Sequence, residues 1–142
     1  MPDFMEYAIE EAKKTVKDIP VGAIIVRDGE ILAQAHNSKE QDNDITSHAE
    51  ILALRKASKK LRNWRLEDCD MYVTLEPCPM CGWAILQSRI KNLYFGSYDK
   101  QYGAFSSSIN LRNISSHKTN IYGGISENIC DVLLKKFFNN IR

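Results

Sequence analysis

The stretch DMYVTLEPCPMCGWAILQS, residues 70–88, decides the fold that we expect. Its first part is rich in apolar, β-branched and aromatic residues, which is typical of a buried strand. Residues 79–88 then favour a short helix, and Pro79 suits the first helical position because its missing N–H costs nothing there. Cys78 is therefore the expected N-cap. A buried strand that runs directly into a helix is the repeating unit of an α/β domain.

The segments on either side extend this pattern. Toward the N-terminus, the sequence predicts an amphipathic helix over residues 3–17, a hairpin over residues 21–36 with Asp28-Gly29 at its turn, and a helix over about 48–61. Toward the C-terminus, it predicts strands at residues 91–97 and 119–124 and a closing helix at 126–140. We expect a three-layer α/β/α domain with a mixed five-stranded sheet, and parallel pairing after the helical crossovers that follow the second and third strands.

Composition limits the class of protein. The chain has 142 residues, 44% of them hydrophobic, which fits one domain with a real core over residues 1–142. No apolar run approaches the about 18 residues of a membrane span, and the acidic N-terminus is unlike a signal peptide, so we expect a cytoplasmic protein without a membrane partner. A net charge of +1 gives no general bias toward nucleic acid, and the basic cluster within residues 55–65 by itself indicates a solvated helix face.

Two expected helix starts concentrate the chemistry. Cys78 and Cys81 lie one turn apart on one helix face, at an N-terminus whose partial positive charge favours the thiolate. With His48 they make three ligands, and zinc with three protein ligands keeps a position open for water, as catalytic zinc sites do. Alone, the Cys-x-x-Cys pair could also be a redox pair. Glu50 has two readings: it could move protons beside the metal, or form a capping box with Ser47.

Six segments, which span nearly the whole chain, together resemble a known family. In order they are IPVGAIIV (19–26), HAEILAL (48–54), YVTLEPCPMC (72–81), SRI (88–90), FGSYDKQYGA (95–104) and GGISENICDVLLKKFFNNIR (123–142). With them, the chain resembles the zinc-dependent nucleobase deaminases of the cytidine deaminase superfamily. Their motif is H-x-E…P-C-x-x-C, in which the glutamate is not a ligand. Within that superfamily it is most similar to the bacterial tRNA-specific adenosine deaminases.

The resemblance implies a cytidine deaminase-like fold, a single deaminase domain and a reaction. One Zn²⁺ per subunit, held by His48, Cys78 and Cys81, would activate water for attack on C6 of adenosine at the wobble position of a tRNA anticodon. Glu50 would move the protons, and the products would be inosine and ammonia.

The resemblance also implies binding residues. Four would hold the target nucleotide: Asn37, Ala49, Leu75 and Glu76. Eight are candidate contacts to the anticodon stem-loop: Lys59, Lys60, Arg62, Asp99, Lys100, Lys136, Phe138 and Arg142. Without the resemblance, Asn37 is typical of a turn and Glu76 of a strand end. Members of the family act as homodimers, and we expect the same here.

Three residues depart from the family pattern, namely Trp83 in the second zinc-ligand helix, Gln101 after the GSYDK segment and Ser116 before the last strand. We expect Trp83 to alter packing or a subunit interface, Gln101 to shift or remove a lysine contact, and Ser116 to weaken an RNA role for its loop. Two other functions stay open: a small-molecule deaminase acting on guanine, cytosine or a nucleoside, and a non-enzymatic RNA-binding or zinc-stabilised module.

Overall fold

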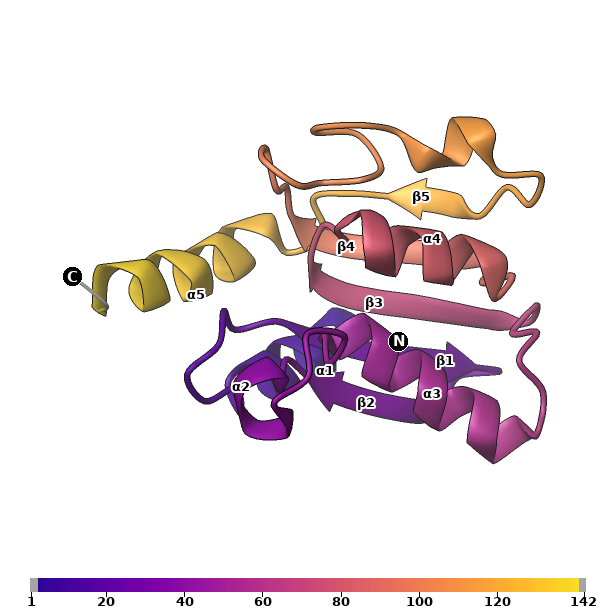
Figure 1. The fold of residues 1–142 in the computed structure, drawn as a ribbon, viewed down its shortest axis with the longest axis horizontal. Coiled ribbons are helices and arrows are strands. Elements are labelled where there is room, and N and C mark those ends of the chain that lie inside the picture. The colour runs from indigo at the N-terminus through magenta and orange to yellow at the C-terminus, as the bar shows by residue number, and fades with distance from the viewer. Residues whose placement is uncertain (1–2, 141–142) are drawn as a thin grey trace.

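The computed structural model describes residues 3–140 and contains one five-stranded sheet with the strand order β2-β1-β3-β4-β5 (Figure 1). The strands are β1 (Gly22–Arg27), β2 (Glu30–His36), β3 (Cys69–Leu75), β4 (Asn92–Ser97) and β5 (Asn120–Tyr122). β1 pairs antiparallel with both β2 and β3, whereas β3, β4 and β5 run parallel. The predicted mixed sheet is confirmed.

The β1–β2 hairpin closes through the predicted two-residue turn. Asp28 has φ 51° and Gly29 has φ 77°. Two successive residues with positive φ match the right-handed twist of the flanking strands, which is why Asp-Gly is favoured here.

The prediction of parallel pairing was right after β3 and wrong after β2. The chain crosses from β2 to β3 through a helix, and the two strands point the same way, but β1 lies between them and pairs with β3 antiparallel, with Ala23 opposite Val73. The first five residues of β1 are all buried. A strand that is apolar on both faces is best covered at the centre of a sheet, so β3 joins its free edge.

Helices cover both faces of the sheet. α1 (Phe4–Ala12) and α5 (Glu127–Asn140) lie on one face, and α3 (Ala49–Leu61) and α4 (Pro79–Gln87) lie on the other (Figure 1). Residues of β1 alternate between these layers, since Ile24 packs with α1 and Ile25 with α3 and α4. The predicted three-layer α/β/α architecture is confirmed.

Some boundaries differ from the prediction. α1 ends at Ala12, five residues early, and Lys17 has φ 65°, which a right-handed helix cannot contain. Two short elements were not predicted, α2 (Lys39–Asp42) and the 3₁₀ helix η1 (Leu111–Ile114). Neither has a buried residue, so neither shows the apolar periodicity that reveals a helix in a sequence. Among residues 3–140, no helix has the length and apolar character needed to cross a bilayer.

Candidate zinc centre and active site

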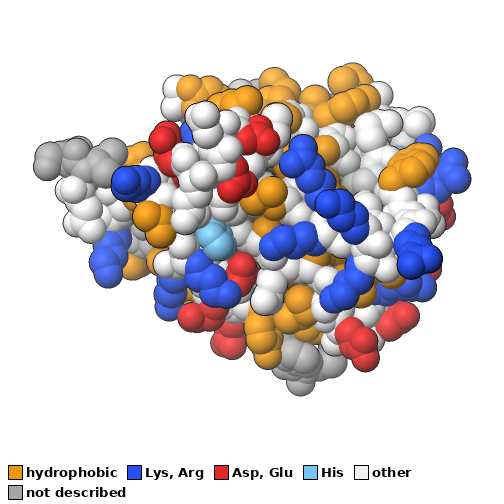
Figure 2. Space-filling view, turned by 60° about the horizontal axis from the view of Figure 1, so that its bottom comes forward, with side chains coloured by type: hydrophobic (Ala, Val, Ile, Leu, Met, Phe, Trp, Pro, Cys, Tyr) orange, Lys and Arg blue, Asp and Glu red, His pale blue; other side chains and the backbone are white. Residues whose placement is uncertain are grey.

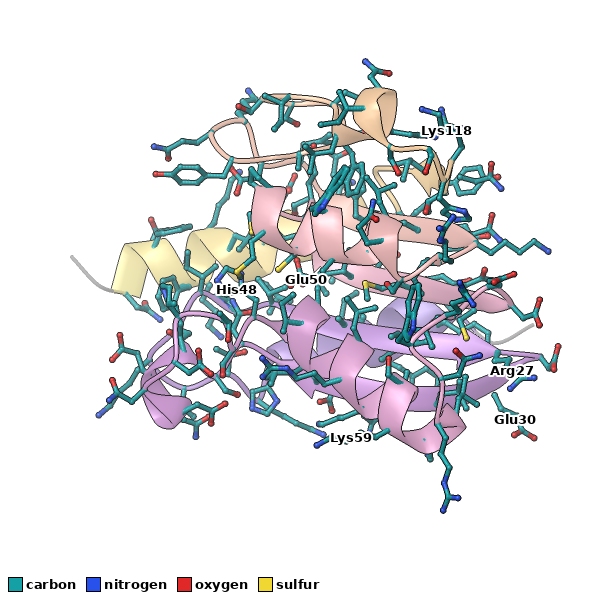
Figure 3. The ribbon with its side chains drawn as sticks, turned by 45° about the vertical axis from the view of Figure 1, so that its right-hand side comes forward. Arg27, Glu30, His48, Glu50, Lys59 and Lys118 are labelled. Carbon is teal, nitrogen blue, oxygen red and sulfur yellow. The ribbon has the colours of Figure 1, made fainter. Side chains whose placement is uncertain are left out.

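α3 and α4 begin at the same end of the sheet, and each begins with a potential zinc ligand. His48 is the N-cap of α3, Cys78 is the N-cap of α4, and Pro79 is the first helical residue of α4, as predicted. Neither side chain makes an N-cap hydrogen bond, so the imidazole and the thiol can turn toward a shared point. Figure 3 shows His48 and Glu50 close together with sulfur atoms beside them.

The three predicted ligands meet with distances that suit zinc. Nδ1 of His48 lies 3.5 Å from Sγ of Cys81 and 3.8 Å from Sγ of Cys78, and the three ligand atoms are all within 4.8 Å of one another. Tetrahedral bonds of about 2.3 Å to sulfur and about 2.0–2.1 Å to nitrogen would separate a sulfur from a nitrogen by about 3.6 Å. Both the donor set and the spacing therefore fit Zn²⁺.

A four-ligand structural site is not formed by the described residues. The possible metal-holding group found within residues 3–140 contains only His48, Cys78 and Cys81. Cys69 is buried at the opposite end of β3, and Cys130 packs between α5 and the sheet on the face that α1 covers. Three protein ligands leave one coordination position for water, the arrangement of a catalytic zinc site.

In the metal-free chain, the pKa values of the two thiols shift in opposite directions. A hydrogen bond from the Cys81 thiol, together with the nearby His48, lowers the pKa of Cys78 to about 4. Donating that bond, together with burial, raises the pKa of Cys81. Zinc binding must displace the Cys81 proton, so metal affinity decreases as the pH falls.

Glu50 lies beside these ligands and does not form the capping box. Its side chain is buried, and burial raises the pKa of its carboxyl to about 7. The N–H of Ser47, which Glu50 would bind in a capping box, donates instead to the carbonyl of Asp44 at 3.1 Å. The alternative in which Ser47 caps the helix is wrong, because His48 occupies the N-cap position. A carboxyl with a pKa near neutrality can both accept and donate protons.

Two residues predicted to hold the nucleotide form a hydrogen bond with each other. Oδ1 of Asn37 accepts from the N–H of Ala49 at 2.8 Å, and Nδ2 of Asn37 donates to the carbonyl of Ile19 at 2.8 Å. Asn37 thus satisfies a free amide at the start of α3, which its sequence position just after β2 did not suggest. Leu75 ends β3 beside the turn to Cys78. The contacts of these residues with a nucleotide stay predictions.

The side chain of Glu76 points into the protein. It is 2% exposed, and its carboxylate accepts hydrogen bonds from residues 99–107, a segment we call the β4 loop. Burial alone would raise its pKa, but the bonds from Ser107, Ser106 and Asp99 outweigh burial and leave the pKa below its usual value. Sequence reasoning missed the loop residues that bind Glu76, since no spacing links residue 76 to residues 99–107.

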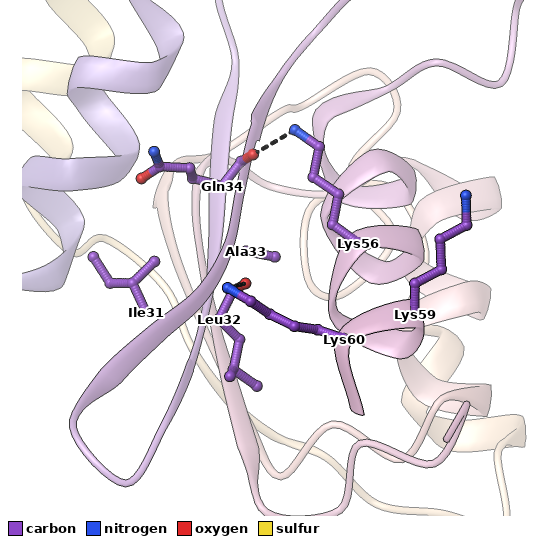
Figure 4. Close-up of a pocket in the computed structure, with 7 residues that line it drawn as sticks. All are labelled: Ile31, Leu32, Ala33, Gln34, Lys56, Lys59 and Lys60. Atoms are coloured by element: carbon purple, nitrogen blue, oxygen red, sulfur yellow. Dashed lines mark hydrogen bonds between the residues drawn. The ribbon is translucent and has the colours of Figure 1, made fainter. Parts of the chain in front are cut away.

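The basic residues of α3 lie away from the zinc centre. Lys59 follows His48 by eleven residues, which is about 16 Å along a helix. Figure 2 shows Lys and Arg side chains gathered on the side that carries β2 and α3. Nζ of Lys60 donates to the carbonyl of Leu32 in β2, while Lys59 extends away from the strand (Figure 4). Arg62 has φ 53° and ends α3.

The other candidate RNA contacts are nearer the zinc end. Asp99 and Lys100 lie at the start of the β4 loop, where Oδ1 of Asp99 accepts from the N–H groups of Gln101 and Tyr102 at 3.1 Å. Lys136 and Phe138 lie on α5, which projects beyond the end of the sheet where α3 and α4 begin (Figure 1). Arg142 lies outside the described residues.

The three departures from the family pattern have defined surroundings. Trp83 is 40% exposed on the outer side of α4, and its neighbour Gly82 provides the close contact: a Cβ there would lie 3.2 Å from Cβ of Ala104. Gln101 is exposed in the β4 loop, and Ser116 is exposed before β5.

Comparison with known families agrees with this geometry. Residues 2–97 match the model of the cytidine and deoxycytidylate deaminase zinc-binding region, and this range includes His48, Glu50, Cys78 and Cys81. The chain belongs to the cytidine and deoxycytidylate deaminase family. The matched region is a zinc-binding one, and His48, Cys78 and Cys81 form the possible metal site found within residues 3–140. The enzyme class is a zinc-dependent hydrolase.

Individual deaminases of the family match to different extents. The tRNA-specific adenosine deaminase of Bacillus subtilis is 40% identical over 143 residues, covering 98% of this chain and 89% of that protein. A solved structure from a study of A-to-I editing by tRNA:A34 deaminases at the wobble position of transfer RNA has a TM-score of 0.89 and 38% identity, covering 92% of this chain and 98% of that one. The guanine deaminase from Bacillus subtilis has a TM-score of 0.65 and 34% identity over 77% of this chain and 83% of that chain.

Proposed function

We propose that this protein converts adenosine to inosine at the wobble position of a tRNA anticodon. The observation that supports this most is the zinc centre with a buried Glu50, set in a chain that is similar over 98% of its length to a tRNA-specific adenosine deaminase. The guanine deaminase from Bacillus subtilis covers less of the chain and superposes less well, and the guanine deaminase from Nitrosomonas europaea is only 21% identical.

The chemistry follows from the side chains at the two helix starts. His48, Cys78 and Cys81 would hold zinc, which when bound lowers the pKa of a water ligand from about 15.7 to about 7. Glu50 would accept one proton of the attacking water on its carboxylate and deliver it to the purine ring nitrogen N1. It would then take the second proton from the hydroxyl added at C6 and pass it to the departing amine. Such proton transfers contribute about 10²–10⁴-fold to the rate. Water is consumed, the C6–N bond breaks, and inosine and ammonia form.

The nucleotide binds beside this centre. Asn37, the backbone of Ala49 and the β3 end at Leu75 would hold the base and ribose. Support comes from their position near the N-termini of α3 and α4, where Asn37 accepts from the N–H of Ala49 and Leu75 ends β3. A base in an anticodon loop is already partly unstacked, so extracting it costs less than the few kcal/mol that a paired base requires. Lys59, Lys100 and Lys136 are exposed and would contact phosphates of the stem-loop.

The active form is a homodimer in the cytoplasm, where tRNA is modified. Support comes from exposed apolar side chains on α4 and in the segment that follows β4. Met80 is 38% exposed, Trp83 40%, Ile109 46% and Ile114 73%. α4 contacts η1, which ends at Ile114, and exposed apolar side chains that gather into one patch are typical of a protein interface.

The test is deamination of a synthetic anticodon stem-loop with adenosine at the wobble position. Zinc-loaded protein should produce inosine there, measured by nucleoside chromatography with mass detection. The same stem-loop with adenosine moved one position is the control and should stay unmodified. Activity on free guanine or cytosine, with none on RNA, would contradict the proposal and favour a small-molecule deaminase.

A further inference from the structure

The β4 loop packs directly on the helix that carries two zinc ligands. The N–H of Ala104 donates to the carbonyl of Pro77 at 2.9 Å, immediately before Cys78. Gly82 follows Cys81, and a Cβ at Gly82 would lie 3.2 Å from Cβ of Ala104. The loop is therefore a wall beside the zinc centre rather than a separate surface.

A single buried carboxylate holds this wall in place. Oε1 of Glu76 accepts from the N–H of Asp99 at 3.1 Å and from the hydroxyl of Ser107. Oε2 accepts from the N–H groups of Phe105 at 3.1 Å, Ser106 at 2.9 Å and Ser107 at 3.1 Å. Hydrogen bonds to an ionised acceptor are about twice as strong as neutral ones, and here they fix both ends of the loop at one point.

The fit between carboxylate and loop leaves no spare room. A Cβ on Gly103 would lie 2.3 Å from Cδ of Glu76 and 2.5 Å from the carbonyl oxygen of Asp99. Only glycine lets the loop backbone approach the carboxylate this closely.

The tip of the loop carries groups suited to an unpaired nucleotide. Lys100 and Gln101 are exposed, and Tyr102 is 58% exposed. A cation next to an accessible aromatic ring is the combination that single-stranded RNA requires, one for a phosphate and the other for stacking on a base.

We propose that Glu76 is a positioning residue for RNA binding: it holds the β4 loop so that Lys100 and Tyr102 face the nucleotides that flank the target adenosine. This inference rests on the proposed function. Glu76 is 2% exposed and its carboxylate accepts six hydrogen bonds from the loop, so Glu76 acts through the loop rather than by holding the nucleotide itself.

The test compares Glu76→Gln with wild type on the anticodon stem-loop. An amide at this position presents an NH₂ group to N–H donors, so the loop loosens. KM for the stem-loop should rise at least about tenfold, the factor that corresponds to one charge-assisted hydrogen bond, while kcat changes by less than about threefold. Zinc content should stay at one per chain, and hydrogen exchange should accelerate in residues 99–107.

Asp70→Asn is the matched control. It makes the same chemical change at the other end of β3, where Oδ1 of Asp70 accepts from Asn92 at 2.8 Å. Its KM and loop exchange should equal those of wild type. Gly103→Ala is a second variant that loosens the loop with Glu76 intact, and it should raise KM in the same way. It serves as the test if Glu76→Gln fails to fold.

A double variant separates positioning from general stability. Tyr102→Ala should raise KM, and Glu76→Gln/Tyr102→Ala should be no worse than Glu76→Gln alone, because the tyrosine is already displaced. Additive effects, or an unchanged KM in Glu76→Gln, would overturn the role of Glu76. Wild-type protein without activity on RNA would instead overturn the proposed function.

Discussion

Glu50 lies in the first turn of α3, buried beside the zinc ligands and outside any capping box. The amide that Glu50 would bind in a capping box, the N–H of Ser47, donates instead to the carbonyl of Asp44. Burial of the Glu50 carboxyl lowers the stability of the fold, and no capping box offsets this loss. Such a residue is typical of an active site.

Glu50→Gln should therefore separate folding from catalysis. Glutamine has the same shape and cannot accept the proton, so kcat should fall by at least about 10²-fold. Zinc content and the unfolding temperature should stay near wild type, measured by elemental analysis and circular dichroism. Near-normal turnover would show that Glu50 does not move the protons.

The zinc ligands and the other cysteines should respond differently to substitution. Cys81→Ser removes a ligand, and its zinc affinity should fall by more than the about 10–100-fold that the loss of an outer partner costs. Cys69→Ser, at the far end of β3, should bind zinc like wild type. A competition titration with a chromogenic chelator measures both, and equal affinities would contradict the assignment of Cys81.

The ligands could be predicted because each lies at a recognisable helix start. His-x-Glu and Pro-Cys-x-x-Cys state both the residue types and their spacing within one turn. The roles of Asn37 and Glu76 within the protein could not be predicted, because their partners Ala49 and the β4 loop are distant in sequence and close only after folding.

At the scale of elements, α3 protects the open edge of the sheet. β2 is an edge strand, and two of its carbonyl groups accept from lysines of α3: Gln34 from Lys56 at 2.8 Å and Leu32 from Lys60 at 3.1 Å (Figure 4). Together with Lys59, these two lysines and residues 31–34 line a groove of about 730 Å³. Lysines at an edge prevent pairing with a second sheet.

Lys56→Ala/Lys60→Ala should therefore increase self-association through β2. Light scattering at rising protein concentration should show larger species than wild type, with a stability loss of only about 0.2–1 kcal/mol because the lysines are exposed. Lys59→Ala removes one positive charge from the same groove without uncovering a carbonyl of β2 and should scatter like wild type. Equal scattering of the two variants would contradict edge protection.

The helices and strands with strong apolar periodicity were predicted from the sequence, whereas the pairing of the strands was predicted only in part. The sequence of β1 indicates a buried strand, but no local pattern states which strand fills its second edge, so the antiparallel β1–β3 pair was missed. α2 and η1 have no buried side chain and left no signal in the sequence.

For the whole molecule, zinc should join the two halves of the site and stabilise the fold. A ligand at about 100 times its Kd adds about 2.7 kcal/mol of stability when it binds only the folded state. A strong chelator should lower Tm by about 5–10 °C, and added zinc should restore it. Cys81→Ser should show little response to the chelator. A wild-type Tm that is independent of zinc would contradict the ligand set.

The central claim is that this zinc centre deaminates one adenosine of a tRNA. Mass spectrometric mapping of a transcribed tRNA, after incubation with zinc-loaded protein, tests it most directly. We predict inosine at the wobble adenosine alone, with none formed by Glu50→Gln. An unmodified wobble adenosine in a zinc-loaded, folded sample, or conversion of free guanine in its place, would contradict the claim.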